Sequence, residues 1–172
     1  MLALHRQRLE ALRDDLQRRG DRPSLNWPSA DLNLVEALEV VTEYGRLAEA
    51  MYLMMAADHR VLNVERMVLR GALDVLSKGR VRTAHMEAML EAASKRVAEL
   101  GEERCLEDCI QALKADPIRA QIVAVLAAAV AVADNVISEE ERALYERLVT
   151  GLGLTDAQAD ELLAGLLEPS AG

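Results

Sequence analysis

The sequence predicts an all-α fold, a compact bundle of about seven to eight helices built from two related helix-loop-helix halves, with an N-terminal helical extension. Three observations lead to this prediction. Apolar residues recur at steps of three and four along most of the chain, capping residues and glycines separate these segments, and no segment alternates between apolar and polar residues as a half-buried strand would. The 172 residues, 51% of them hydrophobic, are enough to bury one core.

Residues 1–30 are predicted to form an amphipathic helix followed by a linker. Gly20 and Pro23 end the helix, its arginines are expected to form a mixed, solvated face, and Trp27 in the linker is a candidate anchor on the body. A single helix on a proline-containing tether is not stable alone, so it must dock on its own bundle, on a second copy in a homodimer, or on a partner protein. The residues that define the apolar face are Leu2, His5, Leu9, Leu12 and Leu16.

Residues 31–168 hold the other predicted helices. A long helix runs from Asp31 to Asp58, either unbroken or divided near Gly45. The helix from Pro117 to Ala133 starts with an aspartate N-cap and is apolar nearly all round, which places it in the middle of the bundle. The remaining helices are Asn63–Lys78, Thr83–Gly101, Glu102–Ala115, one opened by a capping box of Ser138 and Glu141, and one opened by a capping box of Thr155 and Gln158.

The two halves are recognised by an internal repeat. The stretches AADHRVLNVER and VADNVISEEER share the spacing of an Asp, a β-branched residue three positions on and a Glu seven positions on. Asp58 and Glu65 in the first stretch correspond to Asp134 and Glu141 in the second, 76 residues later and without a gap. Apolar residues on both sides keep the same offset, so a whole helix-loop-helix unit is duplicated.

Composition excludes several classes of function. The net charge of −9 repels nucleic-acid phosphates, and four aromatic residues leave little for base stacking. The start of the chain lacks the apolar core of a secretory signal, and the most apolar run, Ile122–Ala133, is too short to span a bilayer. We therefore expect a cytoplasmic protein that does not insert into the membrane, in which Cys105 and Cys109 are reduced thiols.

The four acidic residues of the repeat are candidate metal ligands: Asp58, Glu65, Asp134 and Glu141. An Asp and a Glu joined by a short connection supply the hard oxygen atoms that Ca²⁺ or Mg²⁺ prefers, and Zn²⁺ is less well suited to them. Neither loop has the EF-hand pattern, and water, backbone or the other half would have to complete the coordination shell. The alternative is metal-independent, with the aspartates satisfying turn amides and the glutamates capping helices.

The repeated pattern Asp-x-x-(Val/Ile)-x-x-x-Glu, entered from a helix that ends Ala-Ala-Asp or Val-Ala-Asp, resembles that of the TerB family of tellurite-resistance proteins and TerB-like domains. The resemblance covers roughly Arg46 to Leu167. It implies a helical bundle whose acidic loops hold divalent cations, and a non-enzymatic role in stress response and in tellurite or phage resistance. It also implies protein partners, among them membrane-linked components at the inner face of the membrane. The ligands carried over by position are Asp58, Glu65, Asp134 and Glu141.

The chain departs from the family pattern at one position in each loop. Family loops have Gly directly after the Asp, whereas this chain has His59 and Asn135. Asn adopts the left-handed αL conformation readily and His does so less readily. We therefore expect the first loop to be remodelled and to bind a cation less well than the family pattern implies.

Other groups have simpler interpretations. Cys105 and Cys109 lie four positions apart on a predicted helix, where they are interpreted as core residues, with a role in tellurite chemistry as the alternative. The methionines are interpreted as core residues or as an adaptable binding surface: Met51, Met54 and Met55. The sequence has no phosphate-binding loop, nucleophile elbow or Glu-x-x-His pair, so we expect no catalytic residues, and a hydrolase using the paired carboxylates is the weakest interpretation.

Overall fold

The structure, a computed structural model, describes residues 6–20, 34–57, 63–133 and 137–155, together with residues 157, 158 and 161. These residues form seven α-helices and no strand, which confirms the predicted all-α fold. None of the helices so described is long and apolar enough to cross a membrane. In chain order they are α1 (Arg6–Gly20), α2 (Leu34–Ala56), α3 (Asn63–Ser77), α4 (Thr83–Leu100), α5 (Glu102–Leu113), α6 (Pro117–Ala131) and α7 (Glu139–Gly151).

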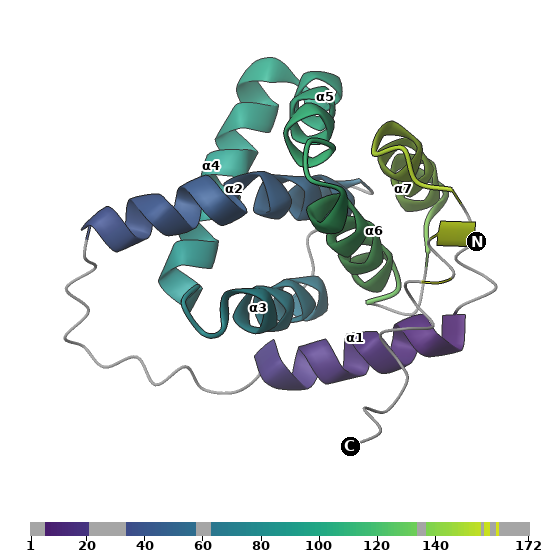
Figure 1. Cartoon of the computed structure of the whole chain (residues 1–172), viewed down its shortest axis with the longest axis horizontal. Coiled ribbons are helices and arrows are strands. Elements are labelled where there is room, and N and C mark those ends of the chain that lie inside the picture. The colour runs from purple at the N-terminus through teal and green to yellow at the C-terminus, as the bar shows by residue number, and fades with distance from the viewer. Residues whose placement is uncertain are drawn as a thin grey trace.

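Helix α6 lies at the centre of the bundle, as its apolar sequence predicts (Figure 1). It packs against α1, α2, α3, α5 and α7. Every residue from Val123 to Ala133 is buried, and this run consists of alanine, valine and a single leucine. Because these side chains are small, neighbouring helices can approach α6 closely on all sides.

Helix α2 is a single helix that continues through Gly45 without a break. It packs mainly against α4, α5 and α6. The Tyr44 hydroxyl donates a hydrogen bond to the carbonyl of Leu76 at 3.3 Å, and Nη1 of Arg119 donates to the carbonyl of Glu43 at 2.8 Å. These two bonds tie the middle of α2 to the end of α3 and to the start of α6.

The ends of two helices are set by the residues that the sequence indicates. At the start of α6, Oδ1 of Asp116 accepts hydrogen bonds from the backbone amides of Ile118 and Arg119, at 3.1 and 3.2 Å. After the end of α3, Gly79 has a φ of 80° and donates its amide to the carbonyl of Asp74 at 3.0 Å. The aspartate N-cap and the αL C-cap are therefore both confirmed.

The predicted capping box after α7 is also formed. The amide of Thr155 donates to Oε1 of Gln158 at 2.9 Å, and the amide of Gln158 donates to Oγ1 of Thr155 at 3.2 Å. Local sequence signals thus determine both the start of α6 and the turn that begins at Thr155.

Helix α1 docks on its own bundle, mainly on α3 and also on α6 (Figure 1). Leu16 is buried in the same hydrophobic core as the rest of the chain. The contact between the two backbones is very close, because a Cβ atom added to Gly71 would overlap the carbonyl of Leu16, and one added to Gly20 would overlap the carbonyl of Met67. In this structure α1 thus docks on its own bundle. The linker with Trp27 lies outside the described residues.

The core is aliphatic and rich in methionine, as the absence of phenylalanine predicts. Met51, Met54 and Met55 are each at most 1% exposed, so they are core residues and form no binding surface. Cys105 and Cys109 are also fully buried and are free thiols.

Candidate cation-binding loops

Glu65 and Glu141 occupy the same position in two helices. Each is the third residue of the helix that follows an acidic loop, α3 for Glu65 and α7 for Glu141. Each is also only 1% exposed, although glutamate is seldom buried. The positive end of the helix dipole favours a carboxylate in the first turn, so both positions suit an ionised side chain. Asp58 and Asp134, the other two predicted ligands, lie outside the described residues.

A helix C-terminus leads into each loop. At the end of α6, the amides of Val132 and Ala133 donate to the carbonyls of Ala128 and Val130, at 3.2 and 3.0 Å. The first loop follows α2, and the structure describes this part of the chain as far as Ala57. The last carbonyl groups of a helix have no partner within the helix, so each loop starts beside oxygen atoms that could coordinate a cation.

The end of α6 is also contacted by an arginine from the N-terminal helix. Arg13 on α1 is 8% exposed, and its Nη1 donates a hydrogen bond of 2.9 Å to the carbonyl of Val132. Nε and Nη2 of the same guanidinium donate to Oδ1 of Asp14, at 3.0 and 2.8 Å. The solvated face expected for the arginines of this helix is therefore wrong for Arg13, which reaches the entrance of the second loop.

The start of α7 carries the cap that the sequence predicts. Oγ of Ser138 accepts a hydrogen bond of 3.1 Å from the backbone amide of Glu141. Three acidic residues occupy the first turn of this helix, where the helix dipole favours them: Glu139, Glu140 and Glu141. This half of the capping box supports the alternative in which the acidic residues stabilise helix ends without a metal.

The chemistry of the donors fits a hard divalent cation. Carboxylate and carbonyl oxygens at the helix ends match Ca²⁺ or Mg²⁺, whereas the two thiols lie on α5, away from the helix ends that flank the loops in the sequence. Within the described ranges, no three His, Cys, Asp or Glu side chains gather closely enough to hold a metal ion. A complete coordination shell would thus depend on the loop aspartates Asp58 and Asp134.

The two cysteines are not poised for reaction. Burial raises the pKa of the Cys109 thiol to about 12, and it also raises the pKa of Cys105. A thiol reacts as its thiolate, so both groups are unreactive near neutral pH. The interpretation of this pair as core residues is supported by their complete burial.

An ionic cluster around the buried carboxylate of Glu49 lies beside these thiols and joins three helices. Glu49 on α2 is 4% exposed, and its carboxylate accepts hydrogen bonds from Arg46 at 3.2 Å and from Arg96 on α4 at 3.1 Å. Arg96 also donates to Asp108 on α5 at 3.1 Å, and Arg104 lies 3.5 Å from the same carboxylate. The hydrogen bond to Glu49 is the main cause of a raised pKa at Arg96. The buried charge of Glu49 is therefore compensated by two arginines.

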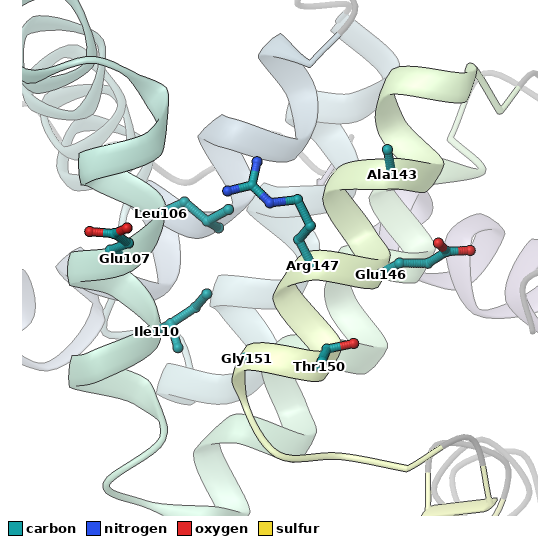
Figure 2. Close-up of a pocket in the computed structure, with 8 residues that line it drawn as sticks. All are labelled: Leu106, Glu107, Ile110, Ala143, Glu146, Arg147, Thr150 and Gly151. Carbon is teal, nitrogen blue, oxygen red and sulfur yellow. The ribbon is translucent and has the colours of Figure 1, made fainter.

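A groove of about 560 Å³ separates α5 from α7 (Figure 2). Leu106 and Ile110 from α5 point toward α7, while Arg147 from α7 extends toward α5. Arg147 forms a two-bonded ion pair with Glu103 at 2.8 and 2.5 Å, which lowers the pKa of that carboxyl. Leu106, Ile110 and Ala143 supply apolar side chains to the lining of the groove.

Sequence reasoning missed Arg13 and Glu49, although each had a signal. Arg13 lies four positions after Leu9 and three before Leu16, in phase with the apolar face of its helix. Glu49 is the single charged residue in the run LAEAMYLMMA. A charged residue at a core position needs a partner. The sequence does not identify the distant partners, Val132 for Arg13 and Arg96 for Glu49, because they lie on other helices or at their ends.

Comparison with known proteins identifies the family. A family model described as "Tellurite resistance protein TerB" matches residues 46–164, which include both acidic loops and exclude α1. No curated protein and no solved structure matches the chain. Because the family model covers more than half of the sequence, the resemblance inferred from the acidic repeat is confirmed, and the chain belongs to the TerB family of tellurite-resistance proteins.

Proposed function

We propose that this TerB-family protein binds divalent cations at its two acidic loops and recruits protein partners in a tellurite or stress response, without catalysing a reaction. The cation would be Ca²⁺ or Mg²⁺ in preference to Zn²⁺. The partners would be protein components of the same response, among them membrane-linked ones, and the site of action would be the cytoplasm.

The observation that carries this proposal is the matched burial of Glu65 and Glu141. Each is 1% exposed at the third position of a helix that follows an acidic loop. Taking an ionised carboxylate out of water is costly unless positive charge or hydrogen bonds compensate for it. A cation at the loop would add such compensation at both positions, next to the carbonyl end of α2 or α6.

A metal-independent scaffold is the second candidate function. It is favoured by the hydrogen bond from the Glu141 amide to Oγ of Ser138, which shows that the second loop caps a helix with its own residues. In this alternative the loops hold the bundle in shape, and its surface alone recruits partners.

Thermal unfolding of metal-stripped protein separates the two candidates. The protein would be titrated with Ca²⁺, Mg²⁺, Mn²⁺ and Zn²⁺, beside the double variant Asp58→Asn, Asp134→Asn. A free cation at one hundred times its dissociation constant should stabilise the wild type by about 2.7 kcal/mol. The double variant should lose this stabilisation.

A matched control is the double variant Glu39→Gln, Glu99→Gln, which makes the same change in net charge at exposed positions on α2 and α4. It should keep the full response to the cation. If no cation stabilises the wild type, or if the control loses the response as the loop variant does, the scaffold is the better account.

A further inference from the structure

The groove between α5 and α7 exists because each of these helices packs mainly on other elements. Helix α5 packs mainly on α2 and α4, and α7 packs mainly on α6. The two meet at the ion pair between Arg147 and Glu103 and at Ile110, whose Cδ1 would lie 2.6 Å from a Cβ atom added to Gly151. Since Glu103 and Ile110 face Arg147 and Gly151 in the same order, the two helices run in the same direction (Figure 2).

The middle of the groove is lined by apolar side chains. Leu106 and Ile110 point from α5 toward α7, and Ala143 is exposed on the α7 wall. Ile110 packs against the core but is only partly buried. The volume of about 560 Å³ lies in the range of ordinary binding pockets, about 300–1,000 Å³. An apolar strip that is open to solvent and bordered by polar residues is typical of a binding surface.

The two walls carry an excess of negative charge. Helix α5 contains four acidic residues and one basic residue, a net charge of −3, and α7 contains four acidic and two basic residues, a net charge of −2. Together they hold more than half of the chain's net charge of −9. Glu107 and Glu146 are exposed, line the groove, and extend to opposite sides of it (Figure 2).

The carboxylates of Glu107 and Glu146 are open to a basic partner. Among the described residues, neither of them belongs to an ion pair, whereas Arg147 is neutralised by its two bonds to Glu103. The pKa of Arg147 is raised mainly by the hydrogen bonds to Glu103, and the charge of Glu107 makes a smaller contribution. This excess of negative charge repels nucleic acids and anionic membranes, so the complementary partner is a basic segment of a protein.

A helix is the shape of partner segment that fits this groove. The described part of the chain contains no strand, and hence no sheet edge to which an extended peptide could add. Two helices with a groove between them accept a third helix at an interaxial distance of about 8–10 Å. Apolar residues at the a and d positions of that helix would face the groove, and basic residues at its e and g positions would lie over Glu107 and Glu146.

We propose that the groove between α5 and α7 binds a basic amphipathic helix of a partner protein. This inference rests on the recruitment of partners proposed above and names the surface that performs it. It requires no cation. Apolar side chains of the partner pack on Leu106, Ile110 and Ala143, and its lysines or arginines pair with Glu107 and Glu146.

The probe for this surface is a synthetic alanine-based helix of about 20 residues, with leucines at positions a and d and lysines at e and g. One control peptide has the same composition in scrambled order, and a second has glutamates in place of the lysines. Nuclear magnetic resonance spectra of the isotope-labelled full-length protein, recorded with a chelator present, locate the bound probe. The probe should shift the amide signals of Ile110, Ala143 and Thr150 most, and the control peptides should not shift them.

Fluorescence anisotropy of the labelled probe measures the effect of substitutions on affinity. The double variant Glu107→Gln, Glu146→Gln should bind about fivefold more weakly at low salt, because two surface charge pairs are lost. Ala143→Arg, which adds bulk and positive charge to the exposed wall, should weaken binding about tenfold. The matched control Glu39→Gln, Glu91→Gln makes the same change in net charge at exposed positions outside the groove lining and should stay within about twofold of the wild type. Circular dichroism verifies that each variant is folded.

Two results together support the inference, namely signal shifts centred on the groove and weaker binding by both groove variants. Equal binding of the scrambled peptide, or shifts spread over all the acidic helices, would reduce the interaction to net charge and overturn it. Absence of binding overturns it as well. Analytical ultracentrifugation of the protein alone adds a further outcome: a dimer that Ala143→Arg dissociates would assign the groove to a second copy of the chain and overturn the partner helix.

These outcomes are distinct from the test of cation binding. If the probe binds in the groove while no cation stabilises the protein, the inference stands and the cation function fails. If a cation stabilises the protein and the probe does not bind in the groove, the inference alone is overturned.

Discussion

Arg96 on α4 donates a hydrogen bond of 3.1 Å from Nε to Oε1 of Glu49, a carboxylate on α2 that is 4% exposed. A second bond from Arg96 reaches Asp108 on α5. One guanidinium thus joins three helices and compensates for a charge inside the bundle. Since charges of this kind are stable only when they are paired, the cluster should respond strongly to the loss of one member.

Replacing Glu49 with Gln should destabilise the fold, because Arg46 would lose its bond to a carboxylate and Arg96 would keep only the one to Asp108. Breaking a buried ion pair costs about 3–5 kcal/mol, and the partial exposure of both arginines reduces the expected loss to about 1–3 kcal/mol. Urea unfolding measures this difference. Glu91→Gln is the control, because Glu91 is 70% exposed in its pair with Lys95 and its loss should cost less than about 0.5 kcal/mol. Equal effects of the two substitutions would contradict the role assigned to Glu49.

Two glycines in helix interiors should respond in opposite directions to alanine. In Gly71→Ala the new methyl group would overlap the Leu16 carbonyl and force α1 away from α3, at a cost of about 1–3 kcal/mol. In Gly45→Ala the methyl group meets only Cγ1 of Val41 at 3.8 Å, so better helix propensity should stabilise α2 by about 0.5–1 kcal/mol. Thermal unfolding of the two variants gives the comparison. A Gly71→Ala variant as stable as the wild type would contradict the close backbone contact between α1 and α3.

The buried thiol of Cys109 should make stability fall at alkaline pH. Its pKa is raised to about 12 in the folded protein, whereas an exposed thiol has a pKa of about 8.5. Above the lower value the unfolded chain releases a proton that the folded chain retains, so stability falls as pH rises toward the folded pKa. Below that value both states are protonated, and the thiol has no effect on the pH dependence.

The measurement is the slope of unfolding free energy against pH between 9 and 10, for wild type and Cys109→Ala. The thiol should contribute a loss of up to about 1.4 kcal/mol per pH unit, which the variant lacks. Leu113→Ala, another truncation at a buried position of α5, controls for the cavity and should retain the wild-type slope. A slope in Cys109→Ala as steep as in Leu113→Ala would show that the thiol titrates normally in the folded state.

Local signals in the sequence predict most of the helix ends, because each depends on a few adjacent residues. Asp116 before Pro117 starts α6, and Gly79 ends the turn after α3. Whether α2 was one helix or two could not be decided, since Gly45 is tolerated in a helix when packing on both sides supports it. Tertiary contacts settle such cases, and the sequence does not specify them.

The candidate site is also predicted only in part, because local sequence patterns indicate some of its features and tertiary contacts determine the others. The repeat places Glu65 and Glu141 in equivalent first turns, and both lie there in the structure. The contact between Arg13 and Val132 could not be predicted, because it joins residues 119 positions apart through the docking of a separate helix. Periodicity places Arg13 on the apolar face of α1, but only the assembled bundle shows which carbonyl group it reaches.

The central claim, that the acidic loops hold a divalent cation, is tested most directly by the nuclear magnetic resonance signals of backbone amides during titration with Mn²⁺. This paramagnetic ion broadens the signals of nearby amides. If the claim is correct, substoichiometric Mn²⁺ should first broaden the signals around Glu65 and Glu141, including Ala57 and Ala133, and excess Ca²⁺ or Mg²⁺ should restore them. Broadening that is spread over exposed carboxylates such as Glu91, with the loop signals unaffected, would contradict it.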